Sequence, residues 1–267
     1  MPSEPAEFAS MKVTVDGHIA TIELSRPEVL NVFDHTLHHE FPSAFTMLAK
    51  DPQVRVAVLR STGRVFSAGG STDMMKDATG PLPSRLGVID DGRTLFRSIA
   101  DFPKPLVVAL EGDAYGLGAT VAMMGDAIVS HPTVKIADTH VVMGLVAGDG
   151  GLVAWPMTVG MTVAKRHLLT GDPLSGQRAY DLGAVTDLAE DRDGVVPLAY
   201  KVAERMASLP PMAVQLTKRG FNKLHHARIE DGFDLGFYLE AMSLGTEDLH
   251  EAVAAFLERR KPDFKGQ

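Results

Sequence analysis

The chain has 267 residues, of which 26 are Lys or Arg and 34 are Asp or Glu, giving a formal net charge of −8 at pH 7. A nucleic-acid partner is not expected, because binding a phosphate backbone requires a basic face and the sequence has no basic cluster. The absence of cysteine excludes disulfides, thiolate metal sites and a cysteine nucleophile.

The start of the chain and its hydropathy predict no membrane segment. Residues 1–8 lack the basic start and the apolar run of a signal peptide. The longest apolar stretches are far shorter than the roughly 20 residues of a membrane span. With 45% hydrophobic residues, the chain can bury a large core. We therefore expect a cytoplasmic globular protein that does not bind a membrane.

The first two-thirds of the chain predicts strands alternating with helices. Residues 11–24 alternate β-branched and polar side chains on either side of Asp16-Gly17, a strong hairpin signal. Residues 34–49 carry apolar side chains at helical spacing behind Asp34, a favourable N-cap. The short apolar runs 54–59 and 106–110 suit strands buried on both faces. Together these patterns indicate an α/β fold with parallel pairing.

After about Ala184 the sequence predicts helices alone. Four amphipathic segments follow without a strand-like run between them, at residues 195–208, 212–225, 229–244 and 247–260. Leu209-Pro210-Pro211 separates the first two. We expect a strand-rich core over residues 1–200 and a helical region over residues 201–267.

Two glycine-rich segments, each after a short strand, are the first candidates for chemistry. Residues 66–70, Phe-Ser-Ala-Gly-Gly, let the backbone approach a ligand and turn its amides outward, although they also suit a simple tight turn. In residues 112–126 a buried strand leads into glycines and then a helix of small residues, whose first amides lack partners within the helix. Negative charge would be stabilised at both places.

A dinucleotide-binding turn is a rival interpretation of the second segment. Gly116-Leu117-Gly118 matches part of that pattern, and Asp138 lies where a ribose-binding acid would be. However, Val121 stands in place of the third glycine, so the match is incomplete. A reductase that binds NAD(P)H is therefore the least favoured function.

The two glycine segments, in this order, resemble the crotonase family, the enoyl-CoA hydratase/isomerase fold. The resemblance covers nearly the whole chain and rests on residues 25–31, 66–70, 112–126, 169–172 with Ala184, and 255–266. It implies a crotonase-like spiral of ββα units and a helical C-terminal region that assembles a homotrimer or a dimer of trimers. It also implies an acyl-CoA substrate whose thioester oxygen is held by two backbone amides, with no metal and no cofactor besides the CoA of the substrate.

Carried onto this sequence, the resemblance assigns those two amides to Ala68 and Leu117. Leu117 replaces a glycine that is common there, but the donor is the amide and survives the change. Such donors stabilise an enolate or tetrahedral oxyanion by roughly 3 to 4 kcal/mol each. The neighbours expected to bind the substrate are Gly69, Gly70, Gly116 and Gly118.

The acid/base groups depart from the family pattern. Hydratases of the family place two glutamates at positions that are Thr120 and His140 here. Because neither is a carboxylate, water cannot be added as it is in those enzymes. Thr120 is left to bind a water molecule or nothing.

A histidine and an aspartate replace the glutamates as acid/base candidates. His140 titrates near neutrality, and Asp149 is able to accept its second ring proton and so orient it as a base. Residues 138–151, followed by Trp155-Pro156, resemble family members that hydrolyse carbon–carbon bonds in cyclic β-diketones. Two other interpretations stay open, namely that both residues are structural or that Asp149 donates the proton while His140 positions the substrate.

Basic residues favour a CoA thioester over a free diketone. Lys76 follows the first glycine segment. Arg259 and Lys261 lie in a C-terminal tail that the resemblance places near the CoA nucleotide bound by a neighbouring subunit. Each of the three residues also suits a solvent-facing position. The leading hypothesis is an enoyl-CoA hydratase/isomerase-type enzyme. The alternatives are a carbon–carbon bond hydrolase of β-dicarbonyl compounds and a CoA-binding paralogue without activity.

Three further groups are assigned structural or solvated positions. His38-His39 lacks the spacing of a metal pair and is expected on a solvated helix face. His225-His226, near Lys218, is expected on the surface. Asp126 matches a family aspartate that is structural.

Overall fold

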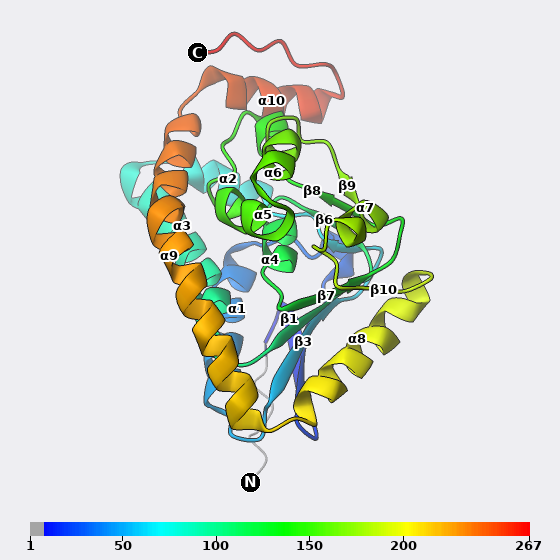
Figure 1. The fold of residues 1–267 in the computed structure, drawn as a ribbon. Helices are drawn as coiled ribbons and strands as arrows, with labels where there is room; N and C mark the ends of the chain where they lie inside the picture. The colour runs from blue at the N-terminus through cyan, green and yellow to red at the C-terminus, as the bar shows by residue number, and fades with distance from the viewer. Residues whose placement is uncertain (1–7) are drawn as a thin grey trace.

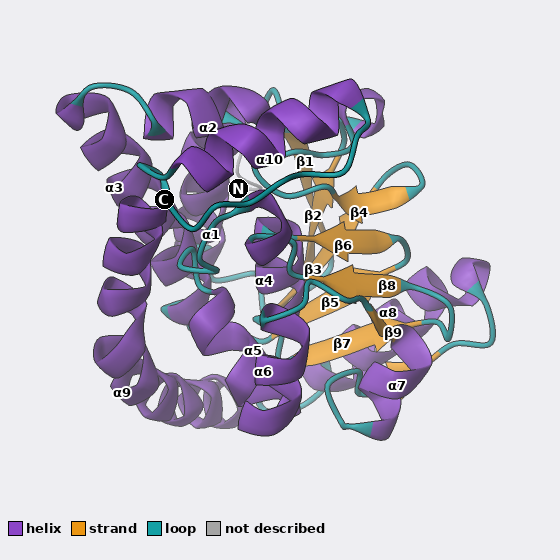
Figure 2. Ribbon diagram, turned by 90° about the horizontal axis from the view of Figure 1, so that it is seen from above, coloured by secondary structure: helices purple, strands orange, loops and turns teal. Residues whose placement is uncertain are grey.

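The computed structural model describes residues 8–267, which form two sheets with helices packed around them (Figures 1 and 2). The segment 1–7, where the sequence predicts no signal peptide, lies outside the described residues. The larger sheet has the order β1-β2-β3-β5-β7-β10 and the smaller sheet the order β4-β6-β8-β9. The larger sheet consists of β1 Met11–Asp16, β2 Ile19–Leu24, β3 Val56–Ser61, β5 Leu106–Leu110, β7 Ala127–Ser130 and β10 Asp187–Leu188. The smaller sheet consists of β4 Val65–Ser67, β6 Asp113–Tyr115, β8 Lys135–Ala137 and β9 Leu174–Ser175.

The predicted hairpin and the predicted buried strands are confirmed. β1 and β2 pair antiparallel, and Gly17 in the turn has φ +55°, a left-handed value that glycine adopts without a steric penalty. The run at 106–110 forms β5, and the run at 54–59 supplies the first four residues of β3, which extends to Ser61; the two strands pair in parallel with Ala57 opposite Leu106. Both strands are almost entirely buried, as their continuous apolar sequences require.

Each central strand of the larger sheet is followed along the chain by a strand of the smaller sheet. β4 follows β3, β6 follows β5 and β8 follows β7, and helical segments come after each pair. This repetition is the spiral of ββα units that the resemblance implied. It brings β4, β6 and β8 side by side in parallel, so that the segments leaving these strands meet at one place.

Helices cover the sheets on both sides and extend beyond them. They are η1 Pro27–Val29, α1 His35–Lys50, α2 Thr72–Ala78, α3 Leu82–Ala100, α4 Leu117–Met123, η2 Val141–Met143, α5 Gly151–Val159, α6 Met161–Leu168, α7 Gly176–Asp181, α8 Arg192–Ala207, α9 Pro211–Ser243 and α10 Glu247–Glu258. α1 begins as predicted, because the Asp34 carboxylate accepts a hydrogen bond from the amide of Leu37.

Two predictions for the end of the chain need correction, and the predicted domain boundary stays a prediction. The segments predicted as separate helices at 212–225 and 229–244 form the single helix α9, since residues 226–228 contain no helix breaker. The short strand β10 follows Ala184, where no strand was expected. The predicted boundary at residue 200 falls inside α8, whose small apolar residues pack on the larger sheet as far as Ala207.

The C-terminal helices extend away from the core. In Figure 1, α9 runs along one side of the molecule and α10 lies across its end. Exposed apolar side chains gather on these two helices, among them Leu235, Tyr238, Met242, Phe256 and Leu257. The predicted homotrimer would bury such a surface, and it stays a prediction. Among the described helices, none combines the length and hydropathy that a bilayer span requires.

Candidate active site

A pocket lies where the segments after β4 and β6 meet the helices, and it contains about 790 Å³ of empty space, part of it open to solvent. Its polar lining comes from residues 68–71 and 116–117, from residues 139–149 and from α9. Its apolar lining consists of Met74, Met75, Val88, Met143, Leu145, Phe237 and Leu244. The pocket therefore joins the two glycine segments to a largely apolar chamber.

The first predicted amide is not available for a substrate. The amide of Ala68 donates to the carbonyl oxygen of Leu30 at 3.0 Å. The prediction of Ala68 as an oxyanion donor is therefore wrong, because its proton is already used to hold this segment against the loop after β2.

Gly70 supplies the unpaired amide instead. Phe33 pairs in parallel with Gly70: its N–H donates to Gly69 and its carbonyl oxygen accepts from Ser71. In such a pairing the central residue's own N–H points away from the partner strand. No acceptor for the Gly70 amide exists among the described residues, and Gly70 lines the pocket.

The second amide belongs to Leu117, the first residue of α4. The first N–H groups of a helix have no partner within it, and the Leu117 amide has none elsewhere in the described chain. The two glycine turns touch, because a Cβ atom built on Gly116 would lie 3.9 Å from the Cα atom of Gly69. The free amides of Gly70 and Leu117 thus lie in one wall of the pocket.

Substituting Gly69 should separate the two turns. Gly69 has φ +88°, and a Cβ atom there would lie 2.8 Å from the carbonyl oxygen of Tyr115. We expect Gly69→Ala to lower the free energy of unfolding by about 1–3 kcal/mol and to reduce turnover beyond what this loss explains, as measured by urea unfolding and by a thioester assay. Gly17→Ala is the control, because its φ is also positive but a Cβ atom there contacts nothing within 4 Å. Full turnover by folded Gly69→Ala would contradict the assignment of this wall.

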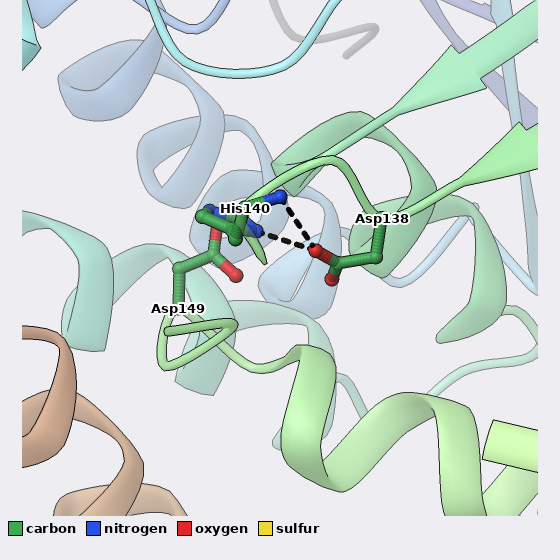
Figure 3. Close-up of side chains that lie close together, drawn as sticks. All are labelled: Asp138, His140 and Asp149. Atoms are coloured by element: carbon green, nitrogen blue, oxygen red, sulfur yellow. Dashed lines mark hydrogen bonds and ion pairs between the residues drawn. The ribbon is translucent and has the colours of Figure 1, made fainter. Parts of the chain in front are cut away.

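His140 is held between two aspartates (Figure 3). Its Nδ1 lies 2.7 Å from Asp138 Oδ1, and its backbone N–H donates to the same oxygen at 3.2 Å. Its Nε2 lies 3.3 Å from Asp149 Oδ2. Sequence reasoning gave the orienting role to Asp149 alone and missed Asp138, which is only 1% exposed.

The two carboxylates keep the imidazole protonated. Burial lowers the pKa of His140, but the charges of Asp149 and Asp138 outweigh burial and raise it well above its usual value. The raised pKa and the carboxylates at both ring nitrogens favour the protonated imidazole over the free base that the sequence suggested. Asp149 also lines the pocket, and its Oδ1 is buried without a partner among the described residues.

Two pocket residues were missed or misplaced by sequence reasoning. Glu240 of α9 lines the pocket, with Oε2 buried and unpartnered. The signal was present, because Glu240 shares one helix face with Phe233, Phe237 and Leu244, a face that is otherwise apolar. His38 is buried and lines the pocket, so its prediction as a solvated residue is wrong.

Other predicted residues lie outside the pocket lining. Gly118 and Thr120 are buried behind it: a Cβ atom on Gly118 would meet Ser67, and Thr120 packs beside Gly150. Their prediction as substrate contacts is therefore not supported by the geometry. Lys76 is exposed and pairs with Asp73 at 2.8 Å.

The basic tail is folded against α10. Arg259 ends that helix, and Lys261 is exposed. The amides of Lys265 and Gly266 donate to the carboxylate of Asp248. Contact of Arg259 and Lys261 with a nucleotide stays a prediction.

Lys218 is not part of a surface patch. It is buried and its Nζ lies 2.6 Å from Asp126 Oδ1, while the other oxygen of Asp126 accepts the amide of Leu106. Asp126 therefore ties α9 to β5, in agreement with its predicted structural role.

The aspartate–histidine group bears on two cofactor hypotheses. Asp138, His140 and Asp149 offer ligand atoms within 4.8 Å of one another, as in a metal site. However, Nδ1 of His140 is already hydrogen-bonded to Asp138, and the expectation of no metal stays a prediction.

The position of Asp138 also bears on the dinucleotide interpretation. Asp138 is buried against His140 and is therefore not placed to bind a ribose, which weakens that interpretation.

The comparisons with known proteins agree with the fold. The family model described as enoyl-CoA hydratase/isomerase matches residues 14–267. The 1,2-epoxyphenylacetyl-CoA isomerase of Escherichia coli K12 is 30% identical, covering 95% of this chain and 97% of its own, and the (E)-benzylidenesuccinyl-CoA hydratase of Thauera aromatica is 31% identical, covering 94% and 97%. The crystal structure of an enoyl-CoA hydratase/isomerase from Mycobacterium paratuberculosis has a TM-score of 0.85 at 34% identity, covering 93% of this chain and 99% of that one. The chain belongs to the enoyl-CoA hydratase/isomerase family and is an enzyme of that family.

Proposed function

We propose that this enzyme binds an acyl-CoA thioester with the carbonyl oxygen between the amides of Gly70 and Leu117. One observation supports this proposal: both amides are unpaired and lie in the same pocket wall as His140. The turn before Leu117 is close to the imidazole ring, because a Cβ atom built on Gly116 would lie 3.7 Å from His140 Cε1. Relatives at about 30% identity carry names with CoA thioester substrates.

Asp149 is the proposed proton acceptor. It takes a proton from the α-carbon of the thioester or from an attacking water molecule, and negative charge develops on the carbonyl oxygen. The amides of Gly70 and Leu117 stabilise that charge, because they are fixed donors that need no reorganisation. His140 holds Asp149 in place through its Nε2, which lies 3.3 Å from Asp149 Oδ2, and Asp138 holds His140 from the other side.

Hydrolysis of a carbon–carbon bond in a β-dicarbonyl compound is the second candidate. It is favoured by one observation: position 120 is a buried threonine outside the pocket, so the polar groups beside the amides are His140 and Asp149. In this reaction Asp149 would take a proton from water and the hydroxide would attack one carbonyl carbon. The bond from that carbon to the α-carbon would then break, and the leaving enolate, held by the amides, would take the proton back from Asp149.

A substrate panel tests both candidates. We expect turnover of at least one acyl-CoA. The reaction is then run in H₂¹⁸O, and the product is analysed by mass spectrometry. Hydration adds one labelled oxygen without cleavage, isomerisation adds none, and carbon–carbon hydrolysis gives two fragments, one labelled. Turnover of free β-diketones alone would favour the second candidate. Ligand binding that raises the melting temperature without turnover of any compound would mean a silent paralogue.

A further inference from the structure

The mechanism above makes no use of Glu240, although this residue lines the same pocket as His140 and Asp149. The loop that carries Asp149 is pressed against α9 at this point: a Cβ atom on Gly148 would lie 2.7 Å from Glu240 Cβ and still closer to the carbonyl oxygen of Gly236. The amide of Val146 also donates to Ser243 Oγ at 3.2 Å. These contacts hold α9 against the loop that carries Asp149, and both Glu240 and Asp149 line the pocket.

Glu240 is a hydrogen-bond donor in this setting. Burial, and next the charge of Asp149, raise the pKa of its carboxyl to about 8, so it is mostly neutral at pH 7. His140 and Asp138 are the other charged groups that act on it, with opposite signs. A neutral carboxylic acid donates one hydrogen bond, and among the described residues Oε2 has no partner.

The surroundings of Glu240 restrict what accepts this hydrogen bond. Apart from Asp149 and His140, its neighbours in the pocket lining include Val88, Leu145, Phe237 and Leu244, which are apolar. A buried donor left without an acceptor costs free energy, so a plain hydrocarbon acyl group would leave Glu240 unsatisfied. An acyl group with one uncharged oxygen on an apolar frame would satisfy it.

We infer that Glu240 is a specificity-determining residue that donates a hydrogen bond to a second oxygen of the substrate, which is therefore an acyl thioester with a ketone or hydroxyl on an otherwise apolar acyl group. The inference rests on the proposed function, because the thioester carbonyl must be held by Gly70 and Leu117 for the acyl group to reach α9. It deepens that proposal by naming the class of acyl group.

The test compares matched ligands and matched variants. Hexanoyl-CoA and its 3-, 4- and 5-oxo and hydroxy derivatives are measured for binding by calorimetry and for turnover, with the wild type, Glu240→Gln and Glu240→Met. Glutamine keeps a neutral donor, whereas methionine has a similar length and no donor. We expect at least one oxygenated ligand to be preferred over hexanoyl-CoA, and Glu240→Met to lose about 10- to 100-fold of that preference while Glu240→Gln keeps it.

The pH dependence separates this role from a structural one. Glu240 donates only when protonated, so the wild-type preference for the oxygenated ligand should fall as pH rises above about 8, while that of Glu240→Gln stays level. The wild type and Glu240→Gln both contain His140, Asp138 and Asp149, the other charged groups that act on Glu240, so a pH dependence that arises from those groups should appear in both proteins. No preference in the wild type, equal losses on both ligands, or a loss in Glu240→Gln as large as in Glu240→Met would overturn the inference. Binding preferences that follow Glu240 without turnover of any thioester would instead overturn the proposed function alone.

Discussion

Replacing Leu117 by proline is expected to reduce kcat/KM for a thioester substrate by about 10²- to 10³-fold without unfolding the protein. Leu117 is the first residue of α4, a position where proline fits because the N–H it lacks has no partner in the helix. The substitution therefore removes one oxyanion donor and leaves the helix in place. Steady-state kinetics and circular dichroism measure the two effects.

Leu117→Ala is the matched control. It removes a similar part of the buried leucine side chain but keeps the amide, so it should lose stability by about 2–5 kcal/mol and retain most of its activity per folded molecule. If proline and alanine lower turnover equally, the Leu117 amide takes no part in the reaction.

Asp149→Asn is expected to lower kcat by about 10²- to 10⁴-fold with little change in substrate affinity. Asparagine has nearly the same shape as aspartate but does not accept a proton. The measurement is kcat and KM on the thioester that the panel identifies. A kcat above a tenth of the wild-type value would exclude Asp149 as the proton acceptor.

Asp138→Asn serves as the companion variant, because Asp138 acts through His140. Removing one of the two charges beside the ring should lower the pKa of His140, since these charges hold it above its usual value. Nuclear magnetic resonance of the ring protons should therefore show His140 protonated at pH 7 in the wild type and titrating at lower pH in Asp138→Asn. An unchanged titration would mean that Asp138 has only a packing role.

Local patterns in the sequence were sufficient for the main elements. The hairpin at Asp16-Gly17, the helix behind Asp34 and the strands at 54–59 and 106–110 depend on turn chemistry, capping and continuous apolar runs, which act over a few residues. The resemblance then supplied the ββα spiral, which local patterns alone would not give.

The direction of a single amide could not be read from the sequence. Three consecutive residues offer an amide here, namely Ala68, Gly69 and Gly70. The sequence does not show which of their N–H groups points into the pocket. The strand-like pairing of Gly70 with Phe33 decides this, and Phe33 is distant in the sequence. The oxyanion donor was therefore assigned to Ala68 instead of Gly70 because the contact that decides it joins distant parts of the sequence.

Asp138 and Glu240 were missed for a related reason. Asp138 follows β8 and becomes a partner of His140 only through the turn between them. Glu240 belongs to a helix that the sequence assigned to assembly, and its place in the pocket depends on the contact of α9 with Gly148. A charged residue on an apolar helix face was the one clue available from the sequence.

A crystal structure with a bound acyl-CoA thioester tests the central claim most directly. We predict the thioester oxygen within about 3 Å of both the Gly70 and the Leu117 nitrogen atoms, with Asp149 facing the α- or β-carbon. A carbonyl oxygen bound elsewhere, or amides at 70 and 117 that point to different places in the complex, would contradict it.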